Sequence, residues 1–239
     1  FALGNLFRRR GEYERAVRVH QHLLSRGDLS QDDRHRAQHG LALDYLKAGL
    51  LDRAEAALLK LEGTRFEAQS RLALLANYER SRDWEHAAQI AQKLESCGQG
   101  SFKGRLSHYL CEQAMACMLA NDPTQALAHL TQAMHIAPDA PRPRMDMAAL
   151  QSQQGDAALA CETLTQALAT APAAVALIAP RLAQYAIACG QGPRALARLK
   201  ALYSHTPSLD VLDAIVALEA ASGAPTATAR EWYARHLES

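Results

Sequence analysis

The chain has 239 residues, a formal net charge of +1, and only 5% aromatic residues. The sequence contains no apolar run of about 18 residues, so we expect no direct membrane insertion by this segment. A nearly neutral chain also lacks the bulk positive charge that drives phosphate-backbone binding, and nucleic acid is not an expected partner.

The first stretch, residues 3–24, contains two apolar stripes at helical spacing around a glycine. The first stripe includes Leu3 and Phe7, and the second runs to residue 24. Gly11 lies where one helix must end and the chain must reverse, which favours a residue that tolerates a positive φ. Gly4 and Ala16 are small where two antiparallel helices would cross, so their backbones can approach closely. This stretch therefore predicts a helix pair.

The same unit recurs along the chain. A small residue of the second helix repeats every 33 to 39 residues, at Ala16, Ala54, Ala87, Ala126, Ala160 and Ala195. The predicted turn residues upstream of these alanines are Gly11, Gly49, Asp83, Asp122, Gly155 and Gly190. Prolines close the later units at positions 138, 172 and 207. This pattern resembles the tetratricopeptide repeat. The resemblance implies an all-α fold, a right-handed α-solenoid of about six to seven helix-turn-helix repeats.

In chain order, we expect units at 1–27, 32–63, 64–97, 105–137, 141–171, 173–206 and 208–239. Helices are predicted over 33–48, 51–62, 209–221 and 226–237. Ser30 is a plausible cap for the helix that follows it, and Pro123 fits the first position of another helix. Trp84 is interpreted as a packing residue at a helix start, with ligand stacking as the alternative.

We expect residues 1–239 to form a single array. Three glycines make segment 97–104 the most flexible stretch of the sequence, and it is either an ordinary long connection or a soft hinge between two halves. The chain begins with Phe1 inside a first helix, so we expect it to be a fragment of a longer protein.

No residues form a recognisable catalytic set. His35 and His39 are four residues apart on one predicted helix, but no metal-ligand pattern accompanies them. The five cysteines are odd in number and form no CxxC pair, which favours buried thiols in a reducing compartment. There is also no glycine-rich phosphate loop. The sequence therefore predicts neither an enzyme nor a metal or cofactor site in this segment.

The remaining candidate is a surface. In tetratricopeptide arrays the first helix of each unit lines an inner groove, and the repeat register assigns residues of this chain to that position. The candidate groove residues are Asn5, Arg8, Arg9, Arg36, His39, Leu43, Lys47, Leu72, Arg80, His108, Cys111, Met115, Met118, Arg142 and Met145, with Ala149 beside them. This groove is expected to be basic at its N-terminal end and rich in methionine in the middle. Core packing of the methionines is an equal alternative.

Two known groove chemistries fit these positions poorly. The carboxylate clamp of chaperone-binding arrays pairs lysine with asparagine, and only Asn5 matches it. The arrays of O-linked N-acetylglucosamine transferases have an asparagine ladder, whereas the equivalent residues here are Ala2, Gly40, Ala73, Glu112, Asp146 and Arg181.

Several segments are similar to the bacterial lipopolysaccharide assembly protein B family. They include Leu3-Gly4-Asn5-Leu6-Phe7-Arg8, Asp44-Tyr45, Ala48-Gly49-Leu50, Asp52-Arg53-Ala54-Glu55 and His108-Tyr109-Leu110-Cys111-Glu112, with further matches at 10–12 and 15–21. The similarity is strongest through about residue 120.

The resemblance implies a non-catalytic adaptor for protein–protein interaction. Members of that family have an N-terminal membrane anchor, a cytoplasmic repeat array at the inner membrane and a downstream rubredoxin-like metal module. The implied partners are a membrane AAA protease and the deacetylase of lipid A synthesis, whose degradation the adaptor promotes. Two alternatives stay open: a substrate-docking region of an O-linked N-acetylglucosaminyltransferase-like enzyme, and a homodimerisation module compatible with either function.

Overall fold

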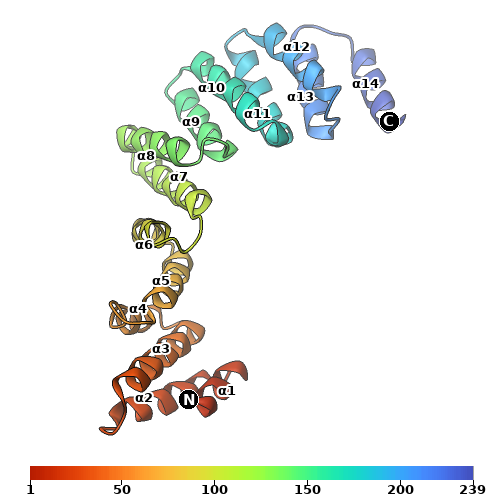
Figure 1. Ribbon diagram of the computed structural model, residues 1–239. Helices are drawn as coiled ribbons and strands as arrows, with labels where there is room; N and C mark the ends of the chain where they lie inside the picture. The colour runs from red at the N-terminus through yellow and green to blue at the C-terminus, as the bar shows by residue number, and fades with distance from the viewer. Residues whose placement is uncertain (239) are drawn as a thin grey trace. The chain divides into compact units, whose positions relative to one another are not determined.

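The computed structural model describes residues 1–238, with Glu238 described by its backbone alone. The described residues are helical and turn-connected, without a β-strand. They form two compact units, 1–109 and Leu110 onward, and the division falls inside helix α7 (Lys103–Leu119) (Figure 1). The prediction of an all-α, tetratricopeptide-type solenoid is therefore confirmed at the level of fold class.

The first unit contains three helix pairs and the start of α7. Each second helix contacts its own first helix and, in α2 and α4, the first helix of the next pair. The six helices of the pairs are α1 (Ala2–Arg9), α2 (Tyr13–Ser25), α3 (Gln31–Ala48), α4 (Leu51–Leu59), α5 (Glu67–Ser81) and α6 (Trp84–Ser96).

The second unit continues the pattern with the rest of α7 and seven further α-helices. Contacts again run from each pair to the next, through α8 to α9, α10 to α11 and α12 to α13. These helices are α8 (Pro123–Ile136), α9 (Pro141–Gln153), α10 (Ala157–Thr170), α11 (Val175–Ala188), α12 (Gly192–Tyr203), α13 (Leu209–Ala221) and α14 (Thr226–Glu238), with the 3-10 turn η1 (Pro172–Ala174) before α11.

The recurring alanines lie where the sequence pattern places them, in the buried faces of the second helices. Five of them are 0% exposed, and Ala195 is 6% exposed. Small side chains at a helix crossing let the two backbones pack closely. Around them, buried leucines such as Leu130 and Leu164 each contribute about 1.5–3 kcal/mol by leaving water.

The turns differ from the prediction in two units. The backbone is left-handed at Gly11, Gly49, Gly155 and Gly190, as expected, but in the third and fourth units it is left-handed at Arg82 (φ 57°) and Asn121 (φ 61°). The predicted turn residues Asp83 and Asp122 come one position later. They act as N-caps instead, because their carboxylates accept hydrogen bonds from the backbone N–H groups three residues on.

The helix starts follow the predicted cap chemistry. The Ser30 hydroxyl accepts a hydrogen bond from the N–H of Asp33 at 3.1 Å, and Pro123 occupies the first turn of α8. Trp84 packs against Tyr109 with a ring separation of 5.9 Å, in agreement with the packing interpretation. One predicted end was wrong: α4 stops at Leu59 rather than at residue 62, since the chain continues as short-range turns.

The glycine-rich connection before α7 contains one anchoring residue. Phe102 is buried, and its backbone N–H donates to the carboxylate of Glu95. A hinge at 97–104 stays a prediction. No helix among residues 1–238 combines the length and the apolar character that crossing a bilayer requires.

Candidate functional site

A cavity of about 360 Å³ opens among three successive first helices of the second unit, α7, α9 and α11. The register of the repeat brings these helices together, since each pair places its first helix beside the first helix of the next. The lining residues are Cys111, Ala114, Met115, Met118, Leu119, Asp146, Ala149, Gln153 and Arg181. This is the position that the sequence assigns to an inner groove, and four of the predicted residues line it.

One wall of this groove cavity is apolar and accessible. Met115 is 47% exposed and Leu119 is 86% exposed, although both are large hydrophobic residues. Met118 is half-buried and also packs on the hydrophobic cluster that includes Leu130. Exposed methionine is an adaptable contact surface, because its unbranched side chain changes rotamer at little cost. Met118 therefore both lines the cavity and packs on the core.

The other wall is polar and contains Asp146, Gln153 and Arg181. The guanidinium of Arg142 donates to Glu112 Oε1 at 2.7 Å and to Asp146 Oδ2 at 3.3 Å, joining α9 to α7. Burial raises the pKa of Asp146 above its usual range, and the positive charges of Arg142 and Arg181 partly offset that effect. The cavity lining thus combines the carboxylate of Asp146 and the exposed residue Arg181 with an apolar wall.

Cys111 forms part of the cavity lining without being a reactive thiol. The residue is buried, and burial raises the pKa of its thiol to about 12. Only the thiolate is a strong nucleophile or metal ligand, so this cysteine acts as a small apolar residue at neutral pH.

In the first unit, two predicted groove cations form hydrogen bonds to the neighbouring helix pair. Arg8 donates to the buried carboxylate of Asp44 at 2.6 Å and to Asn5 Oδ1 at 2.6 Å. On its other side, Asp44 lies 2.5 Å from His20 Nδ1. Arg80 donates to the backbone carbonyl of residue 46 at 2.6 Å. These contacts join neighbouring helix pairs.

The remaining predicted residues of the first unit lie in varied surroundings. His39 stacks on Phe66 at 5.4 Å, and burial, together with the charge of Arg8, lowers the pKa of His39. Arg36 lies 5.2 Å from the ring of Phe1. Leu43 is half-buried, and the exposed positions are Arg9, Arg36, Lys47, Leu72 and His108. His108 packs edge-on against Trp84.

Met145 lies away from the groove cavity lining and packs against the hydrophobic cluster around Leu182. Met145 therefore packs in the core, which was the alternative interpretation of the methionines. Within residues 1–238, no group of three or more histidine, cysteine or acidic side chains is arranged to hold a metal ion, and the pair His35 and His39 belongs to no such group.

Sequence reasoning missed two polar residues of the site, Asp146 and Arg181. Both occupy the register position at which other arrays have an asparagine ladder, and the absence of asparagine led to their exclusion. The register itself was informative, because Glu112, Asp146 and Arg181 recur at steps of 34 and 35 residues and all lie at or next to the cavity. Any polar residue at that position was a candidate.

Comparisons with known proteins agree with this architecture. Residues 1–36 match the family model of the tetratricopeptide repeat. The chain is 32% identical over 167 residues to lipopolysaccharide assembly protein B of Escherichia coli K12 and 29% identical over 171 residues to the protein of that name from Haemophilus influenzae. These matches cover 70% and 71% of this chain but only 43% of each relative.

Among solved structures, the complex of Naa15 and Naa10 bound to HypK-THB aligns with 93% of this chain and 33% of its own, at a TM-score of 0.55 and 16% identity. That likeness concerns the fold alone. The chain therefore has a helical fold of the tetratricopeptide type, is similar to lipopolysaccharide assembly protein B, and spans less than half the length of those relatives.

Proposed function

We propose that this chain is a non-catalytic scaffold that binds a partner polypeptide in the groove cavity of α7, α9 and α11. The observation that supports this function best is the exposure of Met115 and Leu119 beside a polar wall, within a cavity of about 360 Å³. Binding sites in proteins commonly combine an apolar surface with a few convergent polar groups. The repeat family and the names of the relatives also point to a scaffold rather than to an enzyme.

The chemistry of the cavity indicates the kind of segment it accepts. A large apolar side chain of the partner would contact Met115 and Leu119, while polar groups beside it would pair with Asp146 or Arg181. Burying an apolar side chain contributes about 1.5–3 kcal/mol, and the charged pairs fix its orientation. This division between affinity and orientation is typical of peptide recognition.

The finer function follows from the similarity to lipopolysaccharide assembly protein B. In this proposal the full-length protein is an adaptor on the cytoplasmic side of the bacterial inner membrane. It presents the deacetylase of lipid A synthesis to a membrane AAA protease, and so regulates lipopolysaccharide synthesis. The similarity over 70% of this chain supports the assignment.

A photocrosslinking experiment tests this function. A photoreactive amino acid replaces Met115 in the full-length protein, and crosslinked partners from living cells are identified by mass spectrometry. The matched control places the same amino acid at Leu127, which is also 47% exposed but lies on α8, a second helix. We expect the protease or the deacetylase to crosslink from position 115 and not from position 127.

Equal crosslinking from both positions, or crosslinking from position 127 alone, would contradict the assignment of the partner to the groove cavity. No structural observation favours the transferase-docking alternative, because the ladder positions carry Glu112, Asp146 and Arg181 in place of asparagine. Homodimerisation is compatible with the adaptor, and sedimentation of the full-length protein measures it.

A further inference from the structure

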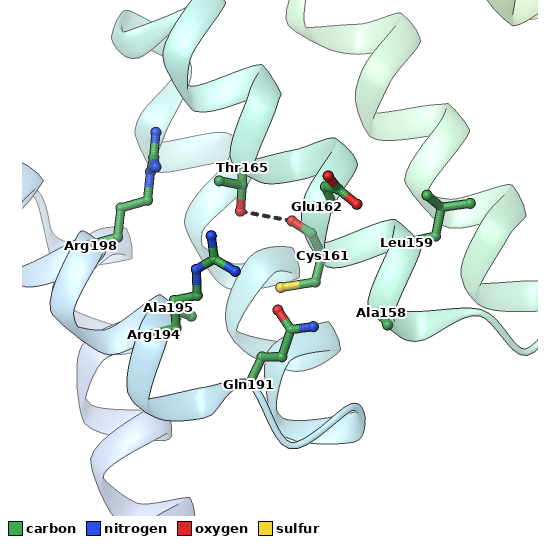
Figure 2. Close-up of a pocket in the computed structure, with 9 residues that line it drawn as sticks. All are labelled: Ala158, Leu159, Cys161, Glu162, Thr165, Gln191, Arg194, Ala195 and Arg198. Carbon is green, nitrogen blue, oxygen red and sulfur yellow. Dashed lines mark hydrogen bonds between the residues drawn. The ribbon is translucent and has the colours of Figure 1, made fainter.

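A second cavity, also of about 360 Å³, lies between α10 and α12, the second helices of two successive pairs (Figure 2). It is separate from the groove cavity, which the first helices line. Its walls are formed by Ala158, Leu159, Cys161, Glu162, Thr165, Gln191, Arg194, Ala195 and Arg198. Unlike the groove cavity, it has two arginines and no large apolar residue other than Leu159.

Arg194 and Arg198 are the distinctive residues of this second cavity. They are four residues apart on α12, so both side chains lie on the same face of the helix. Both are exposed, and within the described part of the chain neither forms a hydrogen bond or an ion pair. Lys200, on the same helix, is paired with Glu219 at 2.5 Å. The guanidinium groups of Arg194 and Arg198 are thus available to bind a ligand, whereas the ammonium group of Lys200 is already paired.

Polar groups accompany the two arginines. Figure 2 shows the guanidinium of Arg194, the amide of Gln191 and the sulfur of Cys161 pointing toward one another. Burial, together with the neighbouring Cys189, raises the pKa of Cys161 to about 11, so its thiol adds no negative charge at neutral pH. The Thr165 hydroxyl donates to the backbone carbonyl of Cys161 at 2.8 Å and could accept one further hydrogen bond.

The surrounding sequence is also positively charged. Residues 163–209 contain no aspartate or glutamate, but they include Arg181, Arg194, Arg198 and Lys200. Glu162 is the one acidic residue among the lining residues of this cavity. Its carboxylate points away from both guanidinium groups in Figure 2 and forms no ion pair with them. Among residues 1–237, no carboxylate therefore forms an ion pair with either arginine.

We propose that the cavity between α10 and α12 binds a phosphate monoester, clamped by the guanidinium groups of Arg194 and Arg198. Two fixed positive charges match a group with a charge of about −1.5 to −2 near pH 7 better than they match a single carboxylate. Guanidinium groups also donate paired hydrogen bonds to phosphate oxygens. Because the cavity is larger than a phosphate group, it has room for part of the attached molecule.

Calorimetric titration of the full-length protein tests this site. The probes are inorganic phosphate, glycerol phosphate as the headgroup of a simple phospholipid, a phosphoserine peptide, and free glutamate. We expect saturable binding of at least one phosphate probe and no comparable binding of glutamate. The variant with Arg194→Gln and Arg198→Gln should bind the phosphate probes at least tenfold more weakly. Arg194→Lys should have an intermediate affinity, because lysine retains the positive charge but cannot donate the paired hydrogen bonds of a guanidinium group.

The control variant, Arg53→Gln with Lys60→Gln, removes two positive charges from exposed positions of the α4 region. It should bind the phosphate probes as the unmodified protein does. A preference among the phosphate probes identifies the source of the ligand. Binding that falls equally in both double variants would show nonspecific charge attraction and overturn the site, as would glutamate binding as tight as phosphate binding, or no saturable binding at millimolar phosphate.

Discussion

At the scale of single residues, the first unit is organised by a buried histidine held between two glycines. A Cβ atom added at Gly4 would lie 2.4 Å from His20 Cε1, and one added at Gly40 would lie 2.7 Å from His20 Nε2. The ring also meets the carboxylate of Asp44, which Arg8 pairs from the other side. Glycine at these positions therefore makes room for a polar network between helix pairs.

Gly40→Ala should destabilise the protein by about 1–3 kcal/mol, because the added methyl group must displace the His20 ring or the helix. The matched control is Gly104→Ala, a helical glycine whose added Cβ would meet nothing within 4 Å. We expect that variant to be neutral or slightly stabilised. Chemical denaturation measures both changes, and equal stability of the two variants would contradict the proposed packing around His20.

Arg82 presents the opposite case, a large side chain in a backbone conformation that suits glycine. A left-handed backbone conformation costs a residue with a side chain about 1–2 kcal/mol. Glycine adopts this conformation without that steric cost, but it loses more conformational entropy on folding. Arg82→Gly should therefore raise stability by about 0.5–1 kcal/mol. Asn121→Gly should gain less, since asparagine tolerates this conformation. A thermal melt that shows Arg82→Gly destabilised would refute this account of the turn.

At the scale of helices, the close contact of each pair depends on its recurring alanine. Ala87 is fully buried in α6, so Ala87→Arg would overpack the helix crossing and bury a charge. We expect a loss of more than about 3 kcal/mol. The control is Ala56→Arg, at an exposed position of α4, which should change stability by less than about 0.5 kcal/mol. A melting temperature for Ala87→Arg within error of the unmodified protein would contradict the helix register.

Periodicity predicted most helices because burial at 3.6-residue spacing leaves a clear pattern, as in the helix over 209–221, whose bounds match α13. The turns were less predictable. The residue with left-handed backbone is Arg82 in the third unit and Asn121 in the fourth. Because neither is a glycine, the sequence pattern pointed to the aspartate that follows each of them. The end of α4 also depends on tertiary packing around Leu61, which is buried just beyond the last helical turn.

At the scale of the whole molecule, the repeat register predicted which helices line the groove cavity but not which side chains are free to bind. Met115 and Met118 line this cavity, whereas Arg8 has a buried partner that is 36 residues away in sequence. Such pairing depends on rotamers and on contacts between pairs, which a one-dimensional pattern does not contain. The polar cavity residues were recoverable from the register alone, as Asp146 and Arg181 show.

The most direct measurement is the affinity of the full-length protein for the protein partner identified by crosslinking, when one charge is introduced into the groove cavity. Met115→Asp places a carboxylate in the apolar wall, and Leu127→Asp makes the same change at a position of equal exposure on α8. We predict at least tenfold weaker binding for Met115→Asp and unchanged binding for Leu127→Asp, with both variants folded by circular dichroism. Unchanged binding for Met115→Asp would contradict the proposal that the partner lies in this cavity.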